Sequence, residues 1–309
     1  MSKSENTDLS TNSPVSSKPS TPRPRDHPVA APPRTSSALP LDDPGPIISN
    51  LKFPVKNSYG GSAHGFLHMP PTSAKVSPVH SRTAAILLSG AGGGVTGPSG
   101  MYLSLATKLP SLPQLPIKVL RLDYRYAART GPCVEDAKAA MTYMGEHFAV
   151  DRFVLVGWSF GGAPVFTLAG RDERVVGAAT VASQTADALK GAREAGRRNV
   201  PVMLLHGTGD RTLSDRCSRH LHEAWYEGYK GPGEGEEKTK LILFDGDDHS
   251  LSRNVEKAEQ FVANFVIECA GGEVEDGKEV VQSEVMGDSE ERKDAMKKGG
   301  DLRGNESLE

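Results

Sequence analysis

The sequence predicts an α/β fold, built on a doubly wound, mostly parallel sheet of about eight strands with helices on both faces. Short runs rich in Val, Ile and Leu recur along residues 46–270, and segments of helical periodicity separate them. Such runs are typical of strands buried on both faces of a parallel sheet, and the alternation favours right-handed crossovers. Ligands of such sheets bind at the carboxyl ends of the strands. The residues directly after each strand are therefore the first candidates for chemistry.

The expected strands and helices follow one another in a regular order. Two opening strands are joined by the turn signal Asn-Ser-Tyr-Gly-Gly. The eight expected strands are 47–55, 62–69, 83–89, 117–123, 152–157, 175–182, 200–207 and 240–246. The helical patterns lie at 101–109, 133–148, 160–170, 213–227 and 252–268.

The two ends of the chain differ from this core in composition. Residues 1–45 contain nine prolines and nine serines, and residues 271–309 contain twelve Asp/Glu and no aromatic residue. Neither segment has enough apolar surface to offset the entropy of ordering it. We therefore expect two disordered tails around one folded domain, residues 46–270.

Charge and cysteine content indicate which binding partners and which cellular compartment to expect. The net charge is −3, and the core carries 25 Lys/Arg against 22 Asp/Glu, too small and scattered an excess for nucleic-acid binding. Cys133, Cys217 and Cys269 lack metal or redox spacing, which favours a reducing compartment. No uncharged apolar stretch is long enough to span a membrane, and no signal peptide is recognisable. We expect a cytoplasmic protein.

The glycine-rich stretch 87–100 matches a nucleotide-binding pattern. Gly92, Gly94 and Gly97 fit G-x-G-x-x-G, and Asp123 closes the next apolar run, where a dinucleotide fold has its ribose ligand. That fold, however, has its glycine loop after the first strand, and here two strands precede the loop. We expect these glycines to let main-chain N–H groups approach negative charge of another kind.

The run Gly157-Trp158-Ser159-Phe160-Gly161 matches G-x-S-x-G between an expected strand and an expected helix. This is the context of a nucleophile elbow, in which a sharp turn exposes the serine hydroxyl. Side chains two residues before and after the serine would collide with neighbouring main chain, so both positions require glycine. Ser159 is therefore the candidate nucleophile, and the start of the following helix aims N–H groups at the same place.

A carboxylate and a histidine follow the last two strands. Asp210, after strand 200–207, suits the role of orienting a histidine, and Asp215 and Asp245 fit it less well. His249, after strand 240–246, is the candidate general base. His206 ends strand 200–207 and is interpreted as a structural residue beneath the site, with the role of base as the less favoured alternative.

The order Ser159, Asp210, His249 is that of α/β-hydrolases. The motifs LLSGAGGG, GWSFGGA, HGTGDRTL and DGDDHSL make residues 47–268 resemble that superfamily, most closely its compact dienelactone-hydrolase-like and small esterase branches. Lids of this superfamily are often inserted between the sixth and seventh strands, and residues 183–199 are too few for a large one. Dienelactone hydrolases use a cysteine nucleophile, so Ser159 favours ordinary ester or thioester hydrolysis.

The resemblance also implies where the oxyanion would bind. The loop after the third strand often begins His-Gly in this superfamily and supplies one N–H, and here the pair is Ser89-Gly90. Ala91 is the expected first donor, with Gly92 as the alternative, and Phe160 is the second.

Several other residues near the strand ends have two interpretations. Arg125 either meets an anionic substrate or braces its own loop. An apolar acyl pocket is expected from the following residues, with core packing as the alternative for each: Trp158, Phe160, Met101, Tyr102, Leu213 and Leu251.

Together these features predict a serine hydrolase that cleaves a carboxylic ester or thioester of a small molecule through an acyl-enzyme. That chemistry needs neither a metal nor an organic cofactor. Thioesterase, peptidase and perhydrolase reactions on the same triad remain alternatives. So does a non-catalytic scaffold of the same fold, which the missing His-Gly pair favours and the complete triad disfavours.

Overall fold

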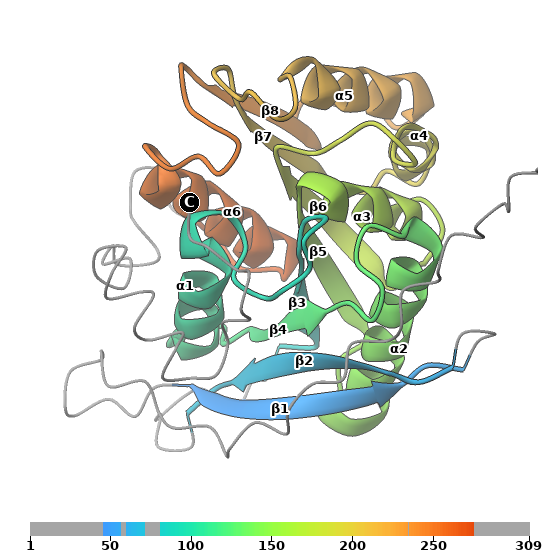
Figure 1. Cartoon of the computed structure of the whole chain (residues 1–309), viewed down its shortest axis with the longest axis vertical. Coiled ribbons are helices and arrows are strands. Elements are labelled where there is room, and N and C mark those ends of the chain that lie inside the picture. The colour runs from blue at the N-terminus through green and yellow to red at the C-terminus, as the bar shows by residue number, and fades with distance from the viewer. Residues whose placement is uncertain (1–45, 57–59, 72–80, 234, 275–309) are drawn as a thin grey trace, which may run out of the picture.

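Within residues 46–56, 60–71, 81–233 and 235–274, which the computed structural model describes, eight strands form one mixed sheet (Figure 1). Their order is β1-β2-β4-β3-β5-β6-β7-β8. The predicted tail 1–45, residues 275–309 of the predicted tail 271–309, and residues 57–59 of the predicted turn lie outside the described residues.

Every predicted strand is present, with its ends within two residues of the expected ones. The bounds are β1 Ile47–Pro54, β2 Ser62–Met69, β3 Thr83–Leu88, β4 Lys118–Asp123, β5 Arg152–Trp158, β6 Val175–Val181, β7 Val202–Gly207 and β8 Thr239–Phe244. β2 runs antiparallel to both β1 and β4, and the strands from β4 to β8 run parallel to one another. The prediction of a mostly parallel sheet is confirmed.

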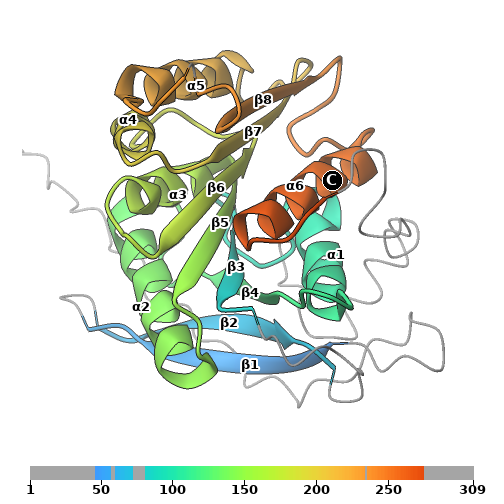
Figure 2. The same cartoon turned by 180° about the vertical axis from the view of Figure 1, so that it is seen from behind.

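Helices cover both faces of this sheet, as predicted. Their bounds are α1 Met101–Lys108, α2 Thr130–Phe148, α3 Gly162–Ala169, α4 Leu189–Arg197, α5 Arg216–Gly228 and α6 Val255–Cys269. Figures 1 and 2 show α2, α3, α4 and α5 on one face and α1 and α6 on the other. Only α4 and its flanking loops lie between β6 and β7, so no large lid is inserted there. No described helix is long and apolar enough to cross a membrane.

The core consists of two layers, one on each side of the sheet. Ile86 and Leu155 pack into the layer under α2 to α5, whereas their neighbours Leu87 and Val156 pack into the layer under α1 and α6. Side chains of a strand alternate between faces, so a strand covered on both sides is apolar throughout. All six residues of β3 are buried for this reason.

The parallel strands bring their carboxyl ends to one edge of the sheet. The loops that follow β3, β5, β7 and β8 therefore meet at this edge, although they are far apart in the sequence. They include the glycine-rich stretch, the serine turn, and the loops that carry Asp210 and His249.

Candidate active site

Ser159 occupies a sharp turn between β5 and α3. β5 ends at Trp158, a single 3₁₀ turn spans Ser159–Gly161, and α3 begins at Gly162. The φ angle of Ser159 is +54°, a left-handed value that few residues other than glycine adopt. The neighbouring loop supports the turn, because the N–H of Gln184 donates to the main-chain oxygen of Ser159 at 3.3 Å. The serine is held in a strained conformation by its surroundings.

Both glycines of the motif are required by close main-chain contacts. A Cβ atom at Gly157 would overlap the carbonyl of Gly161, and a Cβ atom at Gly161 would overlap the carbonyls of Leu88 and Ser89. The steric prediction for this motif is confirmed. The turn can therefore pack directly on the end of β3.

The loop after β7 lies against the loop after β8. The N–H of Gly209 donates to the carbonyl of Asp247 at 2.9 Å. A Cβ atom at either Gly207 or Gly209 would overlap main-chain atoms of residues 246–248. Glycine at these two positions lets the loops approach closely enough for Asp210 and His249 to meet.

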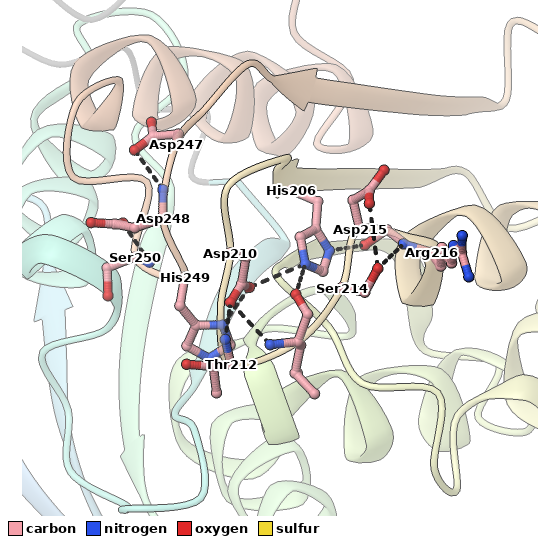
Figure 3. A network of polar contacts seen from close by, with 12 residues as sticks. His206, Asp210, Thr212, Ser214, Asp215, Arg216, Asp247, Asp248, His249 and Ser250 are labelled. Atoms are coloured by element: carbon pink, nitrogen blue, oxygen red, sulfur yellow. Dashed lines mark hydrogen bonds and ion pairs between the residues drawn. The ribbon is translucent and has the colours of Figure 1, made fainter.

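The carboxylate of Asp210 binds the imidazole of His249 (Figure 3). Oδ2 of Asp210 lies 2.6 Å from Nδ1 of His249. Oδ1 accepts hydrogen bonds from the N–H groups of Thr212 at 2.7 Å and Leu213 at 2.9 Å. The carboxylate is fully buried, whereas the imidazole is 18% exposed, so the histidine can face a bound molecule.

The two rival carboxylates have other partners. Asp215 pairs with Arg219 at 2.9 Å, one turn along α5. Asp245 accepts a hydrogen bond from Thr208 Oγ1 at 3.1 Å. Of the three candidates, Asp210 is the one that the fold brings to His249.

The loop that carries His249 is braced by a buried carboxylate that sequence reasoning missed. Asp247 is fully buried, and its oxygens accept from the N–H groups of Asp248, Arg253 and Asn254 and from the Asn254 side chain, at 2.7 to 3.2 Å. These bonds close the loop just before α6 begins. The only sequence signal was the Asp-Asp-His run itself.

Trp158 connects the serine turn to the histidine loop. Its Nε1–H donates to the carbonyl of His249 at 3.1 Å, and the two rings lie 5.6 Å apart. No hydrogen bond joins the described side chains of Ser159 and His249 to each other.

The glycine-rich loop lies beside the serine. A Cβ atom at Gly90 would be 3.6 Å from Cβ of Ser159 and 3.3 Å from the Trp158 ring, so this residue packs on the turn. Ala91 and Gly92 are exposed next to it. Phe160 belongs to the first turn of the helical segment, where N–H groups lack partners within the helix.

Two of the three glycines that suggested a nucleotide have structural roles in the chain itself. Gly94 and Gly97 have φ angles of +85° and +69°, which turn the main chain. A Cβ atom at Gly97 would overlap the ring of Tyr102. Turning and packing therefore account for glycine at these two positions.

Three residues of the expected apolar pocket follow the core-packing alternative. Met101, Tyr102 and Leu251 are completely buried in the core, where none of them lines an open surface. Tyr102 donates its hydroxyl to the carbonyl of Leu88 at 3.0 Å, and burial raises its pKa. These three side chains pack in the core layer under α1 and α6. Trp158 and Leu213 are half-buried, and Phe160 is buried.

Arg125 braces its own loop. Its main-chain N–H and its Nε–H donate to the two oxygens of Asp136, at 2.8 and 2.5 Å, and its Nη1 contacts the carbonyl of Gly60. The guanidinium is buried by these contacts. Burial also raises the pKa of Asp136, and the hydrogen bonds from Arg125 reduce that increase. The bracing interpretation agrees with this geometry, and the substrate-binding one does not.

His206 is fully buried at the end of β7, in agreement with the interpretation that it is structural. The structure adds that it contacts Asp210, with Nε2 3.2 Å from Oδ2.

In the described part of the chain, no group of three or more His, Cys, Asp or Glu side chains is placed to hold a metal ion.

Comparisons with known proteins find similarity in structure. No family model matches the chain, and no curated protein matches it in sequence. The esterase Pf2001 from Pyrococcus furiosus superimposes with a TM-score of 0.56 at 11% identity, covering 72% of this chain and 93% of its own. Est1E from Butyrivibrio proteoclasticus gives a TM-score of 0.54 at 14% identity, with 72% and 99% covered.

A dienelactone hydrolase from Anabaena variabilis gives a TM-score of 0.54 at 14% identity, covering 72% of this chain and 98% of its own. Another structure of Est1E contains ferulic acid. At such low identities the likeness establishes a shared fold.

Proposed function

Because the chain has the α/β-hydrolase fold, we propose that it is a serine hydrolase with Ser159, Asp210 and His249 as its triad. Its substrate is a carboxylic ester or thioester of a small molecule. The observation that carries the proposal is the 2.6 Å contact between Asp210 and His249. The bond from Trp158, which directly precedes Ser159, to the main chain of the same histidine supports it.

The first half-reaction forms an acyl-enzyme. The carboxylate of Asp210 holds the hydrogen on Nδ1 of His249, which leaves Nε2 free to accept the proton of Ser159. Oγ of Ser159 attacks the carbonyl carbon, and the carbonyl oxygen becomes an oxyanion. The N–H groups of Phe160 and Ala91, or Gly92 in its place, stabilise that oxyanion by about 3 kcal/mol each. His249 then gives its proton to the departing alcohol or thiol.

The second half-reaction releases the acid. Water loses a proton to His249 and attacks the acyl carbon, and the tetrahedral intermediate collapses as His249 returns that proton to Oγ of Ser159. Each turnover consumes one water and regenerates the serine. Apart from the substrate and this water, the proposed steps use only groups of this chain.

A serine rather than a thiol fits this site. Cys133 lies in α2, Cys217 in α5 and Cys269 at the end of α6, so none of them belongs to the turn after β5. Burial raises the pKa of Cys133, and it raises the pKa of Cys269 to about 12. Thiols with such pKa values are poor nucleophiles at neutral pH.

The decisive experiment is labelling with a fluorophosphonate probe. We expect the wild-type protein to be labelled and Ser159→Ala to remain unlabelled. Ser214→Ala, which removes an exposed hydroxyl from the loop of Asp210, is the matched control and should label like wild type. Equal labelling of wild type and Ser159→Ala contradicts the proposal.

Turnover tests the other two members of the triad and the substrate class. Asp210→Asn and His249→Ala should each lower kcat by about 10⁴-fold. A panel of p-nitrophenyl esters, feruloyl esters, acyl-CoA thioesters and aminoacyl amides separates esterase, thioesterase and peptidase activity. Absence of both turnover and labelling favours the scaffold alternative, to which Ser89 in place of the usual histidine also points.

A further inference from the structure

The hydrogen positions on His206 follow from its partners. Nε2 lies 3.0 Å from the carbonyl oxygen of Leu213, and a carbonyl only accepts. Nε2 therefore carries a hydrogen. Nδ1 lies 2.7 Å from Oγ of Ser218, whose hydroxyl donates to it when the ring is neutral. Ser218 is itself fully buried in α5, so it holds the ring in this tautomer without competition from solvent.

The same N–H also faces the carboxylate of Asp210. Nε2 of His206 is 3.2 Å from Oδ2, the oxygen that receives Nδ1–H of His249 at 2.6 Å (Figure 3). One carboxylate oxygen is thus shared by two imidazoles. The other oxygen is held by the N–H groups of Thr212 and Leu213.

This arrangement gives the second carboxylate oxygen a partner inside the protein. Without His206, His249 alone among the described residues would bind Oδ2, and this partly exposed histidine must change its protonation state during the proposed reaction. With His206, an interior group holds Oδ2 in place throughout the cycle. A carboxylate that is held in place fixes the orientation of the imidazole. The hydrogen-bond partners behind functional histidines act in this way.

From this geometry we propose that His206 is a positioning residue for the reaction, and that Ser218 orients it. His206 holds Oδ2 of Asp210 in the orientation that receives His249. The inference rests on the proposed function, because His206 acts through Asp210 and His249 on Ser159.

Two variants separate the two sides of the ring. The amide nitrogen of His206→Gln extends far enough to replace Nε2, so it keeps the donor to Asp210. His206→Asn is shorter and replaces only the side that faces Ser218. His206→Leu removes both.

His68→Leu is the matched control, because His68 is also a fully buried histidine of the sheet, bonded to Arg121 at 3.0 Å, and lies on β2 away from the site.

We expect His206→Leu and His206→Asn to lower kcat by about 10- to 100-fold while KM stays near its wild-type value. His206→Gln should restore most of the lost kcat, and Ser218→Ala should give an intermediate loss. The kcat values refer to sites titrated with fluorophosphonate, so misfolded protein does not enter them. His68→Leu should lower the melting temperature and leave kcat unchanged.

A second measurement is independent of turnover. The short Asp210–His249 bond should give a downfield proton resonance, identified by its loss in His249→Gln. We expect that resonance to move in His206→Leu and to return in His206→Gln.

The outcomes are distinguishable. A wild-type kcat in His206→Leu, or failure of His206→Gln to exceed His206→Asn, overturns the positioning role alone. If His206→Leu does not fold, the Gln, Asn and Ser218→Ala variants decide the matter by the same comparison. An unlabelled, inactive wild-type protein overturns the proposed function and this role with it, while the resonance still tests whether His206 orients Asp210.

Discussion

The indole N–H of Trp158 donates to the main-chain carbonyl of His249, a bond of 3.1 Å between residues 91 positions apart. The two rings lie 5.6 Å apart and are tilted by 43°. Trp158 ends β5 and directly precedes Ser159. This bond therefore joins the serine turn to the histidine loop, two segments that lie far apart in the sequence.

Removal of that bond should affect activity more than stability. Trp158→Phe keeps an aromatic ring and deletes the N–H, so it should lower kcat/KM several-fold and cost about 1 kcal/mol of unfolding free energy. Trp225→Phe is the control, because Trp225 also donates its indole N–H to a carbonyl, that of Val200, at 2.9 Å. Trp225→Phe should lower the free energy of unfolding and leave kcat/KM unchanged. Equal kcat/KM for the two variants contradicts a role for the Trp158 bond in catalysis.

A side chain at Gly161 should disrupt the serine turn. Gly161→Ala directs a methyl group at the carbonyls of Leu88 and Ser89, which cannot move without disturbing the end of β3. We expect Gly161→Ala to lower the free energy of unfolding by about 2 kcal/mol or more and to abolish fluorophosphonate labelling. Gly131→Ala, where no atom lies within 4 Å of the new Cβ, should be neutral or stabilising. Chemical denaturation measures both, and a stable, labelled Gly161→Ala contradicts the steric argument.

The ion pair between Asp172 and Arg174 should make stability depend on pH. The hydrogen bond from Arg174 lowers the pKa of Asp172 below its usual 3.8. The unfolded chain therefore binds a proton first as pH falls, so the contribution is complete above the unfolded pKa and is lost as pH falls through the lower folded pKa. Because Arg174 is 35% exposed, the pair contributes only about 0.5 kcal/mol.

Arg174→Gln should accordingly be less stable than wild type at neutral pH and equally stable below both pKa values. Urea denaturation at the two pH values measures the difference. Arg82→Gln, which removes the more exposed pair with Asp151, is the control and should change stability less. A constant difference between Arg174→Gln and wild type at both pH values would show that the arginine stabilises by packing instead.

The strands and the serine turn were predictable because local physics determines them. A strand covered on both faces is apolar throughout, and each of the eight predicted strands is present within two residues. The G-x-S-x-G motif is recognisable within five residues of chain, although only Gly157 is required by a contact inside the motif, and Gly161 is required by the end of β3. Their order along the chain was enough to predict the fold.

Which carboxylate meets His249, and which residues lie behind it, depends on contacts across the sheet. The place of Asp210 directly after strand 200–207 made it the preferred carboxylate, and the close approach of two loops at Gly207 and Gly209 is what brings it to the histidine.

The sequence by itself determined the fold class, the turn at Ser159 and the candidate residues of the site, because each shows in local periodicity or in a short motif and its place after a strand. Only the tertiary structure decided that His206 shares the carboxylate of Asp210, that Arg125 braces its own loop, and that Tyr102 belongs to the core. The physical reason is that hydrogen bonding and burial are satisfied by whichever partners the packed chain brings within reach. Those partners come from strands and helices far apart in the sequence.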